Sequence, residues 1–146
     1  MKNLKFLFLL LIAAVMSGCA VTGDSKEDGI HKVVIQVSTN DARTQKIALN
    51  NAVNLQKAYG AGNVVVEIVA YGPGLSLLTV KNKQSRRVKS LAVDDDFTFS
   101  ACNNTMNKIK KKKGKYPKLT EGVQIVPSGV ARAVELQEQG YAYIRP

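Results

Sequence analysis

Residues 64–71 read Val-Val-Val-Glu-Ile-Val-Ala-Tyr, and this β-branched, nearly continuous apolar stretch decides the fold class. A strand with one exposed face alternates apolar and polar residues, whereas a central parallel strand is apolar at successive positions. Gly72-Pro73-Gly74 ends the stretch sharply, since glycine and proline interrupt regular structure. The stretch therefore predicts a buried parallel sheet with helices on both of its faces.

Strand-type and helix-type patterns alternate on either side of this central strand. After the first strand, Ala48, Ala52 and Leu55 recur at helical spacing. Either Asn40 or Asp41 could accept hydrogen bonds from the first amides of that helix. The alternation predicts one domain over residues 31–146, an α/β fold in which a mostly parallel sheet of about five strands lies in a three-layer α/β/α sandwich.

The predicted strands cover residues 31–37, 64–71, 97–101, 122–126 and 141–145, and the predicted helices cover 41–59, 83–91, 104–112 and 129–139. The apolar residues expected to face the core from the last helix are Val130, Ala133, Val134 and Leu136.

Residues 1–19 have the features of a bacterial export signal. A short basic segment precedes an unbroken apolar stretch, residues 6–15, which is too short to span a bilayer comfortably and suits a signal peptide. Ser17-Gly18-Cys19 resembles a lipobox, in which Cys19 is lipidated and becomes the mature N-terminus. The alternative is ordinary cleavage after Ala20. We expect an exported lipoprotein on the periplasmic face of a bacterial membrane, with residues 20–30 as a flexible tether.

The chain is strongly basic, with 21 Lys+Arg against 11 Asp+Glu and a formal net charge of +10. Much of the excess lies in residues 108–115, Lys-Ile-Lys-Lys-Lys-Lys-Gly-Lys. Such a run binds nucleic acid in some proteins, but export argues against that partner. The favoured interpretation is a solvated helix end, where lysines complement the helix dipole. Contact with anionic membrane lipid is the second interpretation.

Several chemistries are disfavoured by the residues themselves. The single histidine, His31, lies at the start of the domain, so a Ser-His or Cys-His pair is not expected. No cluster of cysteine, histidine and carboxylate has zinc-site spacing, and Gly72-Pro73-Gly74 lacks the lysine of a phosphate-binding loop. We expect neither a metal nor a cofactor. Glu67, inside the central strand, is interpreted as a partnered or edge glutamate in preference to a functional carboxylate.

Polar and small residues follow each of the first four strands, where ligands bind in open parallel sheets. They include Asn40, the stretch Gly72-Pro73-Gly74, and Cys102 with the residues after it. Cys102 is the one cysteine expected to remain in the exported domain, and it precedes a helix. An exposed thiol at a helix N-terminus is stabilised as thiolate, whereas a packed thiol is inert. The predicted site therefore centres on Cys102.

Several stretches of the domain carry a family resemblance: Val33-Val34-Ile35-Gln36-Val37, Ala48-Leu49-Asn50-Asn51-Ala52, Val69-Ala70-Tyr71-Gly72-Pro73-Gly74, Phe99-Ser100-Ala101-Cys102-Asn103-Asn104-Thr105-Met106 and residues 122–143. Through them the chain resembles the DsrE/DsrF-like family over nearly the whole domain. The resemblance implies a three-layer α/β/α fold, commonly assembled as a homo-trimer or hexamer, in which a cysteine at this loop carries persulfide sulfur between partners. Only Cys102 matches that cysteine. The chain differs from the sulfur-relay members in its expected export signal and in lacking their partner subunits in cis.

Two functions follow from the residues and the resemblance together. In the first, the protein handles sulfur or thiol redox chemistry at the cell envelope, and Cys102 is the persulfide-carrying nucleophile. Asn103, Asn104 and Thr105 then supply amide and hydroxyl contacts, with Asn40 on the same edge, while Gly72 and Gly74 allow close backbone approach. Sulfur transfer to or from a partner protein, and not hydrolysis, is the activity that this site would support. The alternative is a membrane-tethered, non-enzymatic binding module with an inert Cys102.

The expected assembly needs a surface through which copies of the chain meet. Leu75-Ser76-Leu77-Leu78, directly after the glycine turn, is apolar enough to provide one. A contiguous exposed patch of this kind is a liability on a monomer. We therefore predict a homo-oligomer, a trimer or a multiple of it, built on this segment.

Overall fold

Five parallel strands form one sheet in the computed structural model, which describes residues 29–95 and 97–146. The strand order is β4-β3-β2-β1-β5, so β2 has neighbours on both edges, as its apolar sequence predicts. The predicted signal peptide, Cys19 and residues 20–28 of the tether lie outside the described residues. The strands are β1 (His31–Val37), β2 (Val64–Ala70), β3 (Thr98–Cys102), β4 (Val123–Val126) and β5 (Ala142–Ile144). The helices are α1 (Ala42–Tyr59), α2 (Ser85–Val93), α3 (Asn103–Lys113) and α4 (Gly129–Glu138), with a 3-10 helix η1 (Gly72–Leu78).

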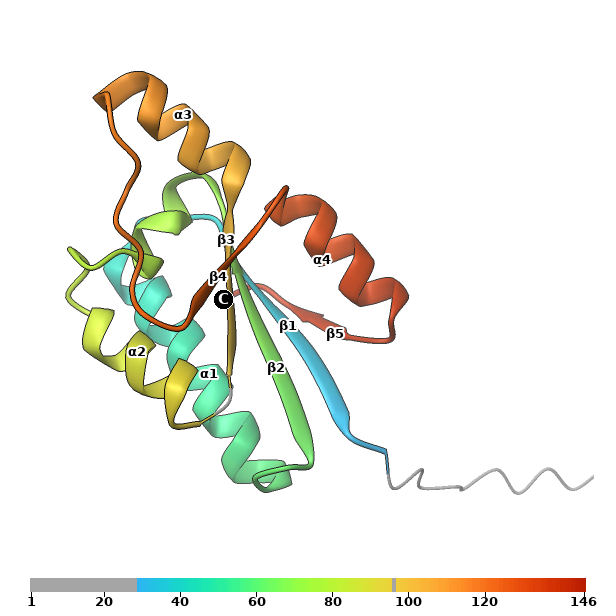
Figure 1. Ribbon diagram of the computed structural model, residues 1–146. Helices are drawn as coiled ribbons and strands as arrows, with labels where there is room; N and C mark the ends of the chain where they lie inside the picture. The colour runs from blue at the N-terminus through green and yellow to red at the C-terminus, as the bar shows by residue number, and fades with distance from the viewer. Residues whose placement is uncertain (1–28, 96) are drawn as a thin grey trace, which may run out of the picture.

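The helices lie in two layers, one on each face of the sheet. Figure 1 shows α1 and α2 against one face and α4 against the other, while α3 extends outward from the carboxyl end of β3. The predicted three-layer α/β/α sandwich is confirmed, and every pairing within the sheet is parallel. Within the described residues, none of the helices combines the length and the apolar character that a bilayer crossing needs.

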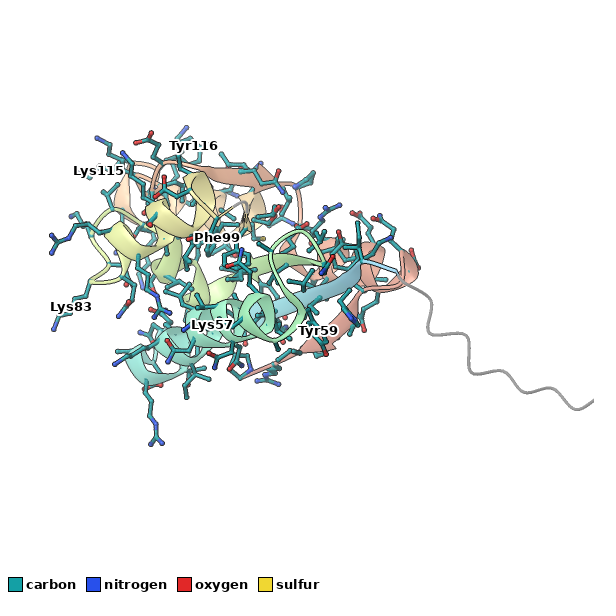
Figure 2. The ribbon with its side chains drawn as sticks, turned by 90° about the horizontal axis from the view of Figure 1, so that it is seen from below. Lys57, Tyr59, Lys83, Phe99, Lys115 and Tyr116 are labelled. Atoms are coloured by element: carbon teal, nitrogen blue, oxygen red, sulfur yellow. The ribbon has the colours of Figure 1, made fainter. Side chains whose placement is uncertain are left out.

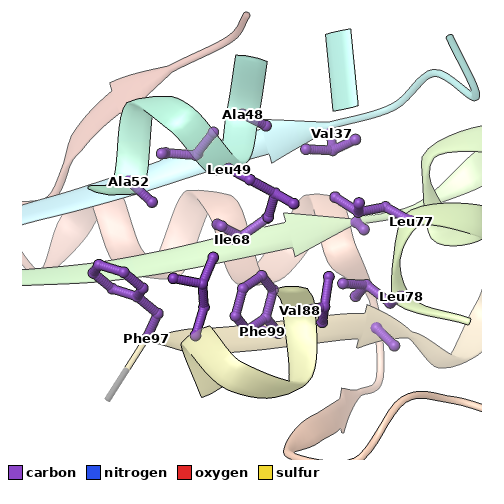
Figure 3. Close-up of a cluster of buried hydrophobic side chains, with 14 of the residues drawn as sticks. Val37, Ala48, Leu49, Ala52, Ile68, Leu77, Leu78, Val88, Phe97 and Phe99 are labelled. Carbon is purple, nitrogen blue, oxygen red and sulfur yellow. The ribbon is translucent and has the colours of Figure 1, made fainter. Parts of the chain in front are cut away.

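The main hydrophobic core lies between the sheet and the layer that contains α1 and α2. Ala48, Leu49 and Ala52 of α1 pack toward Ile68 of β2, as Figure 3 shows. Phe99 of β3 packs with residues of η1 and α2 in the same cluster. The helical spacing of the alanines and the continuous apolar strands therefore meet at this interface, as the sequence pattern predicts.

The leucines of η1 belong to this core and form no exposed patch. Leu75, Leu77 and Leu78 are fully buried, so the expectation that they contact another copy of the chain is wrong. The cause is the tight 3-10 turn, which folds the segment back against β1. A Cβ atom on Gly74 would lie 2.0 Å from the carbonyl oxygen of Val37, so only glycine lets η1 approach this closely.

The second face of the sheet is covered by α4 and is partly polar. Ala133 and Leu136 of α4 are buried there, as predicted, but Val130 and Val134 are 58% and 48% exposed. The prediction for the two valines is wrong because the buried stripe of α4 runs through Gly129, Ala133 and Leu136. That stripe is also helical in spacing but is rotated away from the valines.

Glu67 lies beneath α4 and is paired. Arg132 donates from Nε and Nη2 to its two carboxylate oxygens at 2.8 and 2.7 Å, and the Ser100 hydroxyl donates to Oε1 at 2.6 Å. Gln124 in turn donates to the Ser100 hydroxyl at 2.9 Å. The interpretation of Glu67 as a partnered glutamate is confirmed.

Candidate functional site

Cys102 is the last residue of β3 and the residue that precedes the first turn of α3. Its backbone is extended, with φ −70° and ψ 115°, so the chain turns from strand to helix immediately after it. The residue is only 4% exposed and its thiol is free. The predicted position at a helix N-terminus is therefore observed, but the partial exposure expected of a reactive thiol there is not, because Cys102 packs into the core.

Two helix N-termini meet at the Cys102 sulfur. Asn104 and Thr105 belong to the first turn of α3, and Gly129 is the first residue of α4. A Cβ atom on Gly129 would lie 3.2 Å from Cβ of Cys102 and 2.9 Å from the Tyr71 side chain. The absence of a side chain at this position is what lets α4 begin directly beside the thiol. Both helix ends direct partial positive charge at the same place.

Thr105 links Cys102 to the end of β2. The backbone N–H of Gly72 donates to Oγ1 of Thr105 at 2.9 Å. Because that bond uses Thr105 as an acceptor, the hydroxyl proton of Thr105 stays free to donate toward the sulfur. The predicted site residues Gly72 and Thr105 are therefore hydrogen-bonded to each other beside Cys102.

The surroundings of Cys102 act on its pKa in opposite directions. Burial, the largest single influence, raises the pKa of the thiol. Hydrogen bonding from the Thr105 hydroxyl and from the amides of Gly129, Thr105 and Asn104 lowers it, and together these contacts outweigh burial. Cys102 forms no side-chain capping bond to α3, and the net lowering is the combined effect of these contacts. The thiolate is therefore favoured relative to an ordinary cysteine.

The remaining predicted site residues lie on the same edge of the sheet but differ in environment. Asn103 and Asn104 are the first two residues of α3, and the backbone N–H of Asn104 donates to the Pro127 carbonyl at 3.3 Å. Gly74 is buried against β1 and serves the packing of η1. Asn40 is exposed at the end of β1, and the cap of α1 is its neighbour Asp41, which accepts from the Thr44 amide at 2.7 Å.

Gly129 and Tyr71 are not among the predicted site residues, although Pro127-Ser128-Gly129 follows the fourth predicted strand in the sequence. Tyr71 directly follows β2 and packs against Gly129, and burial raises the pKa of its phenol. The signal for Gly129 was its place directly after the capping residue Ser128, whose side chain accepts from the Ala131 amide. The closeness of Gly129 to Cys102 depends on the order of the strands, which no local pattern in the sequence specifies.

The fold and the position of Cys102 define the class of protein. It is an α/β protein with a free thiol at the carboxyl edge of a parallel sheet. The chain belongs to the DsrE/DsrF-like family, whose profile matches residues 31–146. It is also similar to a solved protein of unknown function from Methanobacterium thermoautotrophicum, MTH1491, at 32% sequence identity and a TM-score of 0.69. The match covers 80% of this chain and 99% of that one, so a chain of about the domain's length forms this fold without a long N-terminal segment. No protein with a curated description matches the chain.

Proposed function

We propose that the protein is a sulfur-handling or thiol-redox protein of the cell envelope, in which Cys102 accepts and passes on sulfane sulfur. The observation that carries the proposal is the meeting of two helix N-termini and the Thr105 hydroxyl at one free thiol. Membership of the DsrE/DsrF-like family supports a fold of the sulfur-relay type. Nucleophilic sulfur chemistry needs a thiolate, and this environment favours it.

The transfer step requires no outside oxidant or reductant. The Cys102 thiolate attacks the terminal sulfur of a donor persulfide, R–S–SH. A new S–S bond forms at Cys102 while the S–S bond of the donor breaks, and R–S⁻ leaves with the electron pair. An acceptor thiolate then removes the terminal sulfur by the same step in reverse. The amides of Asn104 and Gly129 stabilise negative charge on the sulfur before attack and after release.

Alkylation of the fragment 29–146, in which Cys102 is the only cysteine, tests this proposal. We expect the iodoacetamide reaction of the folded fragment to have a pH midpoint below that of free cysteine. Exposure to polysulfide should add one sulfur atom to the peptide that bears Cys102, as measured by intact-peptide mass, and Cys102→Ser should gain nothing. A thiol that reacts only in denaturant would contradict the proposal.

A binding module with an inert Cys102 is the second candidate function. The observation in its favour is that the side chain is almost completely buried and packs with the main hydrophobic core. A buried free cysteine behaves as a small apolar residue. Reaction only after denaturation would support this function and reject the first.

We further propose that the domain is exported and held at a membrane by lipid on Cys19. The apolar segment 6–15 and Ser17-Gly18-Cys19 support this location. Cells expressing the full chain should yield a mature N-terminal peptide that begins at Cys19 and carries diacylglycerol mass. Cys19→Ser should release the domain from membranes or block processing. A mature N-terminus at Val21 without lipid would reject the anchor.

A further inference from the structure

A cavity of about 720 Å³ lies between η1, α3 and the segment that follows α3. Figure 1 shows this segment returning from the end of α3 past η1 toward β4. The volume lies within the range of small-molecule sites in proteins, roughly 300–1,000 Å³. The cavity wall reaches Gly72 and Thr105, the hydrogen-bonded pair beside Cys102, but most of the cavity extends away from the thiol along α3.

The wall of the cavity is apolar, and its rim is uniformly basic. Val80 and Ile109 contribute aliphatic surface, and Tyr116 and Pro117 complete the wall. No aspartate or glutamate is among the residues that line it. Within residues 29–95 and 97–146, none of the rim lysines forms an ion pair with a carboxylate. The rim lysines are Lys81, Lys108, Lys112, Lys113, Lys115 and Lys118.

This lysine set accounts for the basic run better than a solvated helix end alone does. Lys110 faces elsewhere and lies over the Tyr116 ring, with Nζ 4.5 Å from the centroid. Lys108, Lys112 and Lys113 instead border the cavity from α3, while Lys115 and Lys118 border it from the following segment. Six like charges around one opening repel each other, and a bound anion would relieve that repulsion.

We propose that this cavity binds an amphipathic organic anion, an alkyl or aryl chain that ends in a carboxylate, sulfonate or phosphate. The apolar wall takes the chain, and the lysine rim takes the charged group. A bare inorganic anion would leave Val80 and Ile109 uncovered, and a neutral apolar ligand would leave the lysines without a counter-charge. A flat membrane surface fits a concave site poorly, which favours a single ligand molecule. This site does not depend on the reactivity of Cys102.

Calorimetric titration of the fragment 29–146 with dodecanoate, in detergent-free buffer and below micelle formation, tests the proposal. We expect saturable binding of one dodecanoate per chain. Dodecyltrimethylammonium has the same chain with the opposite charge, and acetate has the charge without the chain, so neither should bind. Equal binding of the cationic amphiphile would overturn the proposal. So would binding to phosphatidylglycerol vesicles without saturable binding of the monomeric anion, because that result assigns the lysines to a membrane surface.

Matched variants separate the cavity from general charge. Lys112→Glu combined with Lys115→Glu should weaken dodecanoate binding by about tenfold or more. Lys46→Glu combined with Lys57→Glu makes the same change of net charge on exposed positions of α1 and should leave affinity within about twofold. Figure 2 shows Lys57 well apart from Lys115 and Tyr116. An equal loss in both double variants would overturn the proposal.

A second pair of variants tests the apolar wall at surface positions that folding tolerates. Val80 lines the cavity and is 42% exposed, whereas Val93 is 51% exposed on α2 and does not line it. Val80→Asp should reduce affinity by about tenfold or more, because it places a carboxylate beside the bound chain. Val93→Asp should bind as the parent does. Unchanged binding in Val80→Asp would show that the ligand lies elsewhere and would reject the cavity.

Discussion

Thr105 is the residue on which the ionisation of Cys102 most directly depends. Its hydroxyl lowers the pKa of the Cys102 thiol against the opposing effect of burial. We predict that Thr105→Val raises the pH midpoint of Cys102 alkylation, because the hydroxyl donor is lost. Thr105→Ser keeps the hydroxyl and should react as the parent does. A midpoint that stays unchanged in Thr105→Val would show that the helix amides alone set the pKa.

The lowered pKa of Cys102 makes the free energy of unfolding depend on pH. A thiol whose pKa is lower in the folded state than in the unfolded state stabilises the fold once it is ionised. That contribution is fully present above the pKa of the unfolded thiol and is lost as pH falls through the lower pKa of the folded state. The unfolding free energy of the parent relative to Cys102→Ser should therefore increase with rising pH in this interval, as measured by urea denaturation.

Gly74 is constrained by its close packing against the backbone of β1. A Cβ atom there would lie 2.0 Å from the Val37 carbonyl oxygen, so β1 or η1 must move to admit it. We predict that Gly74→Ala destabilises the fragment by about 3 kcal/mol or more. Gly114 has a left-handed backbone, φ 76°, but open space around it, so Gly114→Ala should cost only about 1 kcal/mol. Equal costs in urea denaturation would contradict the close approach at Gly74.

At the scale of elements, the pair Glu67–Arg132 ties β2 to α4. Glu67 is 3% and Arg132 27% exposed by side chain, so the pair is mostly shielded from water. A double-mutant cycle with Glu67→Gln and Arg132→Met should give a coupling free energy of about 1.5–3 kcal/mol in urea denaturation. The exposed pair Lys89–Glu121 serves as the control and should couple more weakly, because water screens it. Equal coupling in the two cycles would contradict a specific tie between β2 and α4.

Element boundaries were largely predictable because each is marked by a local signal. The apolar run of β2, the spacing of the alanines in α1 and the glycine after α3 depend only on neighbouring residues. The segment of η1 was ambiguous, because its leucines suit either a core turn or an exposed patch. Val130 and Val134 were misplaced because two stripes on α4 have helical spacing, and only the position of the sheet selects between them. These errors concern the direction in which an element faces.

At the level of the whole molecule, part of the candidate site could be predicted from the sequence and part could not. Cys102, Gly72 and Thr105 could be assigned to one edge from the rule that parallel strands end together. The approach of Gly129 to Cys102, and the cavity rimmed by lysines from α3 and its following segment, could not. Both depend on the directions in which α3 and α4 extend from the sheet. The sequence pattern of each element does not specify these directions. The basic run is evident from the sequence, but its position beside an apolar wall follows only from the fold.

At the scale of the whole molecule, we predict that copies of the chain assemble. Because the leucines of η1 are buried, we assign the contact surface to α4 and not to η1. Val130 and Val134 lie one helical turn apart on α4, and both are about half exposed. Ile125 on the edge strand β4 is 55% exposed as well. Exposed apolar groups of this kind favour contact with another protein surface, and we propose that this surface is another copy of the chain.

We therefore predict a trimer, or a multiple of it, for the fragment 29–146 in light scattering at micromolar concentration. Val130→Glu with Val134→Glu should give a monomer, because two charges would be buried in the interface. Val93→Glu changes an equally exposed valine on α2 and should leave the assembly intact. A monomeric parent would reject the assembly, and a stable oligomer in the double variant would reject α4 as its surface. Since α4 begins at Gly129, contact through this helix would bring a second copy close to Cys102 and restrict which donors reach the thiol.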